Sequence, residues 1–505
     1  MRKVVKTREV PHRFAVFGAV LALLGFPLVG QDAELDLEKL FHESIPVSPF
    51  IGVVYRFADA MLEHGRDVYG SERTGMLLGA LDRNTLKPLK TRPRAPAGVS
   101  EGSRPGPTEE PLVGSNPQSD QNLLRLLYFL KGLSGEDRYP QAADAGLTWI
   151  LHNGQSSNTG LLAWGKHLSW NVTTDEVTCV GKEPLHEFSR PWMLWERCFQ
   201  LAPQQSKRFA LGLWEHHVAN QEAGGLRRCA DFDRTGTRPV TNCPRHAGFF
   251  MRTWGEAFAH TGDEEFLRAI DAVLTGYEKK QSRGAQPDGR RSTSTDTCGV
   301  LSMAIDCDGA ARKVPEPLRG RLTAFAARED ERFCSLPHDL VRRRGFAESF
   351  NPTETAPEAS YTSLWNPEDS RHTTAAVALM CMSRYQNTGR VGYRHLIVAA
   401  ADAYLDSLPD EQTDAWPLSF GQAITLELAA FRIMAEKKYH ARAFKLGEIA
   451  IERFFGDSPL PRASLKTDHY ENTTGADTLA LSLAELHLST LTITAVRTPA
   501  NTIDR

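Results

Sequence analysis

The chain has 505 residues, of which 59 are Lys or Arg and 62 are Asp or Glu, so its formal net charge is −3. A charge so near neutrality excludes a nucleic-acid binder that relies on a broad basic face, because phosphate contacts need an excess of cations. Hydrophobic residues make up 41% and charged residues 24%, which fits a folded globular protein and not a disordered one. Length alone predicts about two to four domains.

Residues 1–30 have the pattern of an export signal. A basic stretch with Arg2, Lys3 and Arg13 precedes the apolar run Phe14–Val29, and the small Gly30 marks a plausible cleavage point. The run is shorter than the roughly 20 apolar residues that a membrane helix needs. We therefore predict an exported protein, periplasmic or extracellular, without stable membrane insertion after cleavage. An uncleaved anchor is the alternative. Residues 31–48 then form an N-terminal extension.

Helical hairpins are the recurring unit of the rest of the chain. Residues 85–118 are rich in Pro, Gly, Ser and Arg without any period, which predicts a long surface loop. After them an apolar helix, a short turn and an amphipathic helix follow one another repeatedly. The expected pairs are Leu123–Leu133 with Tyr139–Leu151, Pro191–Leu201 with Ser206–Val218, Phe249–His260 with Glu265–Tyr277, Cys298–Ile305 with Leu318–Phe333, Ala375–Gln386 with Tyr393–Ser407, Ala423–Ala435 with Tyr439–Phe455, and Ala476–Leu488 with the early helix Pro49–Tyr69.

The pairing of the last helix with the first predicts a closed ring. Repeats of this length either stack as an open solenoid or close on themselves. Turns within a pair are short, whereas the connections between pairs are long, so a ring would place all long loops on one face. The expected fold is all-α, an α/α toroid of about six to seven hairpins. It forms one domain over residues 49–490, followed by a tail at 491–505, and its long-loop face carries the function.

The long loops contain most of the unusual side chains. The expected catalytic candidates are Glu187, His246, His372, Asp468, His469, Tyr470 and Glu471. Aromatic faces stack on sugar rings and cations grip acidic groups. The expected substrate-binding candidates are therefore Trp164, His167, Trp170, Arg190, Trp192, Arg245, Trp416 and Lys466. Trp192, together with Trp195 at helical spacing, could equally belong to the core.

Several other polar residues have structural interpretations. Asp306 and Asp308 lie at the short-turn end of a predicted inner helix and are interpreted as turn or capping residues. Arg197 is expected to pair with a nearby carboxylate. The pair His216 and His217 is expected on a helix surface.

The eight cysteines show no metal-binding spacing, so no metal site is predicted and no cofactor is expected, although calcium is possible for an enzyme that acts on acidic sugars. Cys229 and Cys243 flank one polar loop and are the likeliest disulfide pair. The alternative is that most of the cysteines are small buried apolar residues.

Helical hairpins, a one-sided set of loops rich in Trp, His and Asp, and an export signal together resemble the six-hairpin glycosidase-like enzymes. These are α/α toroids that include unsaturated glucuronyl hydrolases and α/α-barrel pectate lyases. The resemblance covers residues 49–488 and is architectural. It implies an oligo- or polysaccharide partner that contains uronic acid, and it implies no nucleic-acid partner.

Two chemistries remain open. Hydrolysis would pair Glu187 with Asp468 or Glu471 as acid and base, and the resemblance favours this mechanism. β-Elimination would use Arg190, Arg245 or Lys466 to neutralise a uronate while a His or Tyr side chain takes the C5 proton. A non-catalytic module that binds glycans or proteins is the alternative from another functional class.

Overall fold

The computed structural model describes residues 48–241, 243–282, 295–350, 359–369, 371–491 and 498–500. The predicted export signal, the N-terminal extension as far as residue 47 and most of the predicted tail lie outside the described residues. Ser48 begins the compact unit that contains the helical pairs. Among the described helices, none combines the length and apolarity that a membrane crossing requires.

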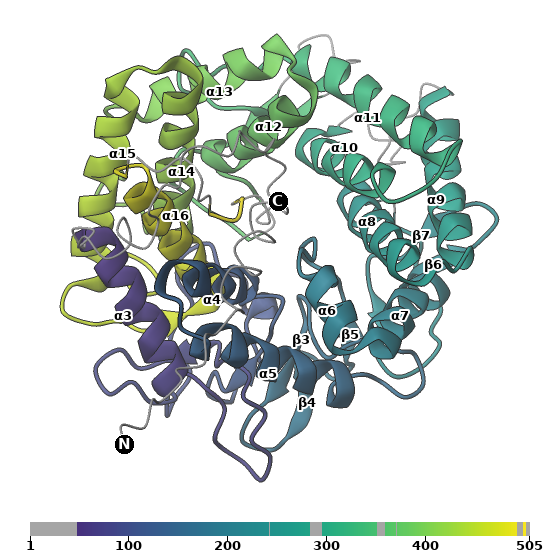
Figure 1. The fold of residues 1–505 in the computed structure, drawn as a ribbon, viewed down its shortest axis with the longest axis horizontal. Coiled ribbons are helices and arrows are strands. Elements are labelled where there is room, and N and C mark those ends of the chain that lie inside the picture. The colour runs from purple at the N-terminus through teal and green to yellow at the C-terminus, as the bar shows by residue number, and fades with distance from the viewer. Residues whose placement is uncertain are drawn as a thin grey trace, which may run out of the picture. The chain divides into compact units, whose positions relative to one another are not determined.

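Seven inner helices surround the centre of this unit (Figure 1). Contacts run from α8 to α10, α12, α14, α16 and α4 in turn. The inner helices are α4 (Gln121–Ser134), α6 (Trp195–Leu201), α8 (Pro244–Thr261), α10 (Thr297–Ala311), α12 (Thr374–Thr388), α14 (Pro417–Met434) and α16 (Ala476–Leu488).

The other helices of the hairpins pack outside this inner ring (Figure 1). They are α5 (Arg138–Asn153), α7 (Pro203–Gly212), α9 (Glu265–Ser282), α11 (Leu318–Cys334), α13 (Val391–Tyr404), α15 (Lys437–Ala450) and α3 (Pro49–Glu63). The first helix, α3, packs against the last, α16, so the described residues form seven hairpins in a closed ring. The predicted α/α toroid is confirmed.

Local sequence explains where the hairpins turn. The turn glycines Gly135, Gly262 and Gly389 all follow inner helices and take the left-handed conformation, with φ of 75°, 68° and 66°. Glycine adopts this conformation without a Cβ penalty, which ends the helix and reverses the chain. Inner helices such as α10 and α14 are buried along nearly their whole length, because the ring encloses them on all sides.

Short strands join the long loops to one another. Five small antiparallel sheets are present in the described residues. They pair β1 (Ala80–Leu81) with β12 (Tyr470–Glu471), β3 (Leu168–Asn171) with β2 (Gly114–Ser115) and β4 (Glu176–Cys179), β5 (Leu185–His186) with β8 (Ala230–Asp231), β6 (Val218–Asn220) with β7 (Gly225–Leu226), and β10 (Ala347–Phe350) with β9 (Thr295–Asp296) and β11 (Ser360–Tyr361). These sheets were not predicted because each spans only a few residues.

Three local predictions need correction. Helix α10 continues to Ala311, so Asp306 and Asp308 lie within it; Asp306 pairs with Arg252 and Asp308 with Arg384. His217 is fully buried, because the chain there forms a π-helical turn that leads into strand β6.

The region predicted as a long surface loop also reaches the interior. Arg104 and Leu112, both in the 85–118 segment, are buried, because this segment crosses the long-loop face and packs against it.

Candidate functional site

A hollow of about 160 Å³ opens where the loops before several inner helices meet. Four of the side chains that line it are cations: Lys166, Arg190, Arg245 and Arg371. Its other lining side chains include Glu368, Asp369, His372, Trp416 and Gln422. Loops that are far apart in the sequence therefore converge, as the toroid predicts, and the resulting pocket suits a negatively charged ligand.

The charged side chains of the pocket are held in place. Lys166 Nζ lies 3.0 Å from Asp369 Oδ2, which ties the loop after α5 to the loop before α12. Arg371 lies 2.8 Å from Glu348 and 3.3 Å from Glu368. Arg190 donates to the carbonyl of Ser119 at 3.2 Å. Such restraint reduces the side-chain entropy that ligand binding would otherwise cost.

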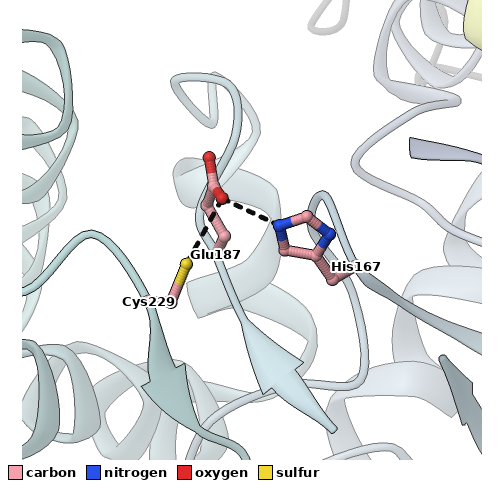
Figure 2. Close-up of side chains that lie close together, drawn as sticks. All are labelled: His167, Glu187 and Cys229. Atoms are coloured by element: carbon pink, nitrogen blue, oxygen red, sulfur yellow. Dashed lines mark hydrogen bonds and ion pairs between the residues drawn. The ribbon is translucent and has the colours of Figure 1, made fainter. Parts of the chain in front are cut away.

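A second cluster, around the fully buried Glu187, lies next to the four cations of the pocket. His167 Nε2 is 3.1 Å from Glu187 Oε2, and His246 Nε2 is 3.3 Å from Oε1. Cys229 Sγ lies 3.4 Å from Oε2, and Figure 2 shows His167 and Cys229 approaching the carboxylate from two sides. Arg228 Nε donates to Oε1 at 2.9 Å. The cluster adjoins the pocket, because Lys166 and Arg245, the neighbours of His167 and His246, line it.

Electrostatics keep Glu187 ionised. Burial raises the pKa of its carboxyl, but hydrogen bonds from His167 and His246 and the charge of Arg228 outweigh this effect, so the pKa lies below its ordinary value. The carboxylate is therefore available as a ligand at neutral pH.

The two histidines share one orientation. Gly102 O lies 2.9 Å from His167 Nδ1, and Cys243 Sγ lies 2.8 Å from His246 Nδ1. A carbonyl can only accept, so His167 carries a proton on Nδ1 and directs Nε2 at Glu187. His246 Nε2 is buried and has Glu187 Oε1 as its neighbour at 3.3 Å. Metal-ligating imidazoles typically donate the other ring N–H to a carbonyl or carboxylate, as His167 Nδ1 does to Gly102 O.

Cys243 and His246 form a coupled pair. Burial raises the pKa of the thiol, but the adjacent His246 more than offsets it and lowers the pKa of Cys243 to about 7. Burial likewise lowers the pKa of His246, and the nearby Cys243 reverses this and raises it. Thiolate character at Cys243 favours a proton on His246 Nδ1.

A metal ion would find N, O and S donors here. One ligand atom each from His167, Glu187 and Cys229 lie within 4.8 Å of one another, and His246 adds a second imidazole nitrogen to the same carboxylate. The sequence did not indicate this cluster, because its members come from separate loops and lack the close spacing of zinc-binding motifs. The predicted Cys229–Cys243 disulfide is not formed, since all eight cysteines are thiols.

Some predicted site residues reach the pocket and others do not. Arg190, Arg245, His372 and Trp416 line it. Lys466 lies outside the lining, where its Nζ donates to the carbonyl of Gln412.

The predicted aromatic platforms are mostly core residues. Trp164 and Trp192 are fully buried, with ring centroids 4.7 Å apart, and Trp195 packs beside them. Trp170 packs edge-on against Trp149. None of these four indoles lines the pocket, so they pack in the core beneath the loops.

The predicted run from Asp468 to Glu471 is engaged elsewhere. Asp468 is more than half exposed and pairs with Arg83. Glu471 is fully buried, accepts two bonds from Arg104 and lies 2.8 Å from His469. Tyr470 is buried beside Phe57. Both carboxylates of the run, Asp468 and Glu471, are therefore paired with arginines, and their role as acid or base stays a prediction.

Lys166 and Arg371 were missed by the sequence analysis. Each directly precedes a histidine that was chosen, His167 and His372, in a loop already assigned to the functional face. Basic residues next to selected loop histidines were therefore the available signal.

Comparisons with known proteins match the part of the chain that carries this site. Residues 105–281 match the family described as periplasmic pectate lyase. A pectate disaccharide-lyase from Dickeya dadantii (strain 3937) is 28% identical over 145 residues, which covers 28% of this chain and 26% of that protein. The matched stretch spans about a quarter of that curated relative. These relatives are carbohydrate-active enzymes, in agreement with the resemblance found from the sequence.

Solved structures with similar helical arrangements include a sugar isomerase and a mannanase. A D-mannose isomerase is 10% identical with a TM-score of 0.47, covering 89% of this chain and 100% of its own. An alpha-1,6-mannanase from Salegentibacter sp. HEL1_6 is 7% identical with a TM-score of 0.43, covering 86% and 98%. The fold assignment rests on the helix order of this chain, not on these distant similarities.

Proposed function

We propose that this protein is an exported polysaccharide lyase that cleaves uronate-containing glycans by β-elimination. The observation that carries the proposal is the wall of four cations, which adjoins a buried cluster of metal-ligand type. His167, Glu187, Arg190, Arg245 and His246 all fall in the stretch similar to periplasmic pectate lyases. The resemblance found from the sequence favoured hydrolysis, whereas this proposal favours β-elimination.

A divalent transition metal fits the buried cluster better than calcium does. Imidazole nitrogen and thiol sulfur suit first-row transition metals, whereas calcium takes six to eight oxygen ligands. His167 and His246 would bind through Nε2, and Glu187 would add a carboxylate oxygen, with Cys229 beside them. A metal held there would withdraw electron density from a bound uronate carboxylate and so acidify the neighbouring C5 proton.

The chain's own residues have separable roles in elimination. Lys166, Arg190 and Arg371 bind the acidic chain. At the reacting sugar the C5–H bond and the C4–O bond break, a C4–C5 double bond forms, and the leaving oxygen takes a proton from water.

We place proton removal at His372, with the charge of Arg245 beside it in the pocket to stabilise the carbanion. Burial, and next the charge of Arg245, lower the pKa of His372 to about 3. A group with this pKa is a weak base at neutral pH. We therefore expect Arg245, whose guanidinium stays protonated and stabilises the carbanion that forms at C5, to be the indispensable member of the pair.

The direct test is incubation of purified protein with a polymer of uronic acid. Elimination creates an unsaturated sugar that absorbs ultraviolet light, together with new reducing ends. We expect both signals to appear together, to disappear after chelation and to return when Mn²⁺ or Co²⁺ is added.

Variants identify the site. His167→Ala and His246→Ala should abolish the absorbance, whereas His395→Ala, which changes an exposed histidine on α13, should leave it intact. New reducing ends without absorbance would establish hydrolysis instead. Binding of the polymer with neither signal would establish the non-catalytic module.

A further inference from the structure

The segment 97–104 contacts the functional site at three points. Gly102 O accepts from His167 Nδ1 at 2.9 Å. Ser103 Oγ donates to Asp369 Oδ2 at 2.9 Å, on the carboxylate that also holds Lys166. Ala97 O accepts from the indole nitrogen of Trp416 at 3.0 Å. A segment with only a single short 3-10 turn, at 101–103, thus reaches both the cationic pocket and the cluster around Glu187.

One buried ion pair anchors this segment. Arg104 donates to both oxygens of Glu471, at 2.9 and 2.8 Å, and neither side chain is exposed. The remaining guanidinium nitrogen donates to Glu101 and to the carbonyl of Pro93. A planar bidentate pair fixes direction as well as distance.

Glu471 is itself restrained from the other side. His469 Nε2 lies 2.8 Å from one of its oxygens, and Thr473 Oγ1 donates to the other at 2.6 Å. Strand pairing of Glu471 with Ala80 fixes its backbone. The anchor therefore links the loop before α16 to the segment that carries Gly102.

We propose that Arg104 and Glu471 are positioning residues that hold the Gly102 carbonyl against His167. The carbonyl keeps a proton on Nδ1 and turns Nε2 toward Glu187, where a metal would bind. The metal part of this proposal rests on the proposed function; the orientation of His167 does not. Outer partners of metal ligands typically change metal affinity by about 10- to 100-fold.

The first measurement is binding of Co²⁺ alone to metal-free protein, followed by calorimetry and by the visible spectrum of the bound ion. Arg104→Gln/Glu471→Gln replaces the ion pair with two neutral amides, and Glu101→Gln weakens the anchor from its half-exposed side. We expect about tenfold or greater loss of affinity for the double variant and a smaller loss for Glu101→Gln.

A matched control separates positioning from general stability. Arg384 and Asp330 form another buried bidentate pair, on α12 and α11. Arg384→Gln/Asp330→Gln should match the destabilisation and leave Co²⁺ affinity and spectrum unchanged. Equal loss in both double variants would overturn the proposal.

The second measurement needs no metal. ¹⁵N spectra of histidine-labelled protein, with His167 assigned from a His167→Gln variant, report which ring nitrogen carries the proton. We expect a defined Nδ1–H signal in the wild type that shifts or broadens in Arg104→Gln/Glu471→Gln. An unchanged signal would overturn the positioning role. If wild-type protein does not bind Co²⁺ but its Nδ1–H signal still shifts in Arg104→Gln/Glu471→Gln, the positioning role is supported and only the proposed metal centre is rejected.

Discussion

Arg245 and His372 share the reacting position of the proposed site but differ in what each can do. If Arg245 is indispensable, Arg245→Lys should lower kcat by about 10²- to 10³-fold, the range expected when a group that stabilises transition-state charge is lost. His372→Gln should cost far less, because a group with a pKa of about 3 contributes little as a base. Initial rates of formation of the unsaturated product measure both effects.

A matched control for Arg245→Lys is Arg197→Lys. As predicted from the sequence, Arg197 pairs with a carboxylate, Asp144, away from the pocket, and its replacement should leave kcat unchanged. If His372→Gln instead loses as much activity as Arg245→Lys, proton removal by the imidazole, and not the charge of Arg245, limits the rate.

Glu427 makes stability depend on pH. It is fully buried on α14, and neither carboxylate oxygen has a hydrogen-bond partner. Burial is the main reason that its pKa rises to about 9; Asp402 raises it further, whereas Arg442 and Lys438 oppose the shift. Tyr404 also lies near it. The folded state therefore holds a proton that the unfolded state releases above its ordinary pKa of 4.5.

The sign of the effect follows from this difference in bound protons. Because the folded state binds more protons between about pH 4.5 and 9, the free energy of unfolding falls as pH rises through that window. Glu427→Gln should remove this slope, so that the variant gains stability over the wild type as pH increases. Urea unfolding at several pH values tests this, with the exposed Glu448→Gln as control. Parallel curves for wild type and Glu427→Gln would contradict it.

At the scale of elements, α8 connects ring packing to the site, because its first turn carries Arg245 and His246. Gly248 lets α8 approach α10 closely: a Cβ there would lie 2.9 Å from the Cα of Met303. Gly248→Ala should therefore push the helices apart, cost about 1–3 kcal/mol and lower activity more than stability alone explains.

Gly132 provides the same substitution without a neighbour, since nothing lies within 4 Å of its Cβ position on α4. Gly132→Ala should gain about 0.5–1 kcal/mol from helix propensity and leave activity unchanged. Thermal unfolding and initial rates of both variants decide the matter. Equal changes in thermal stability and initial rate in the two variants would show that α8 and α10 can move apart without loss of function.

The helices could be predicted from the sequence better than their ends could. Apolar periodicity and the repeated turn glycines mark the hairpins, but α6 begins at Trp195 and not at Pro191. The cause is remote: the Gln121 side chain bonds the carbonyl of Pro191 and the N–H of Met193 at 3.0 and 2.6 Å. No local pattern reveals a partner that lies on another helix.

The sequence predicted only part of the candidate site, because contacts with remote segments decide which side chains reach it. Loop position identified Glu187, Arg190, Arg245, His246 and His372, because long connections on one side of a toroid must converge. Burial decided the rest. Trp164 is buried in the core. Glu471 forms a buried ion pair with Arg104, which lies in a segment whose composition suggested only a surface loop. The direction in which a side chain points and the remote residue with which it pairs are decided only when the ring packs.

At the scale of the whole molecule, closure of the ring depends on α3, the first described helix. Phe50 on α3 is fully buried and packs edge-on against Phe444 of α15 at 4.8 Å. Phe50 also packs closely against α15 at Gly447, where an added Cβ would lie 2.8 Å from the Phe50 ring. Closure therefore removes the two free ends that an open helical solenoid would have to cap.

This closure makes a prediction about cooperativity. One apolar cluster contains buried residues from all seven hairpins, so loss of α3 packing should weaken the whole ring and not one edge. Phe50→Ala should cost about 3–5 kcal/mol and shift a single unfolding transition, with helicity and activity lost together. Val341→Ala, at a 91% exposed position, should change little. An early transition that releases α3 while activity persists would instead show that the ring functions when open.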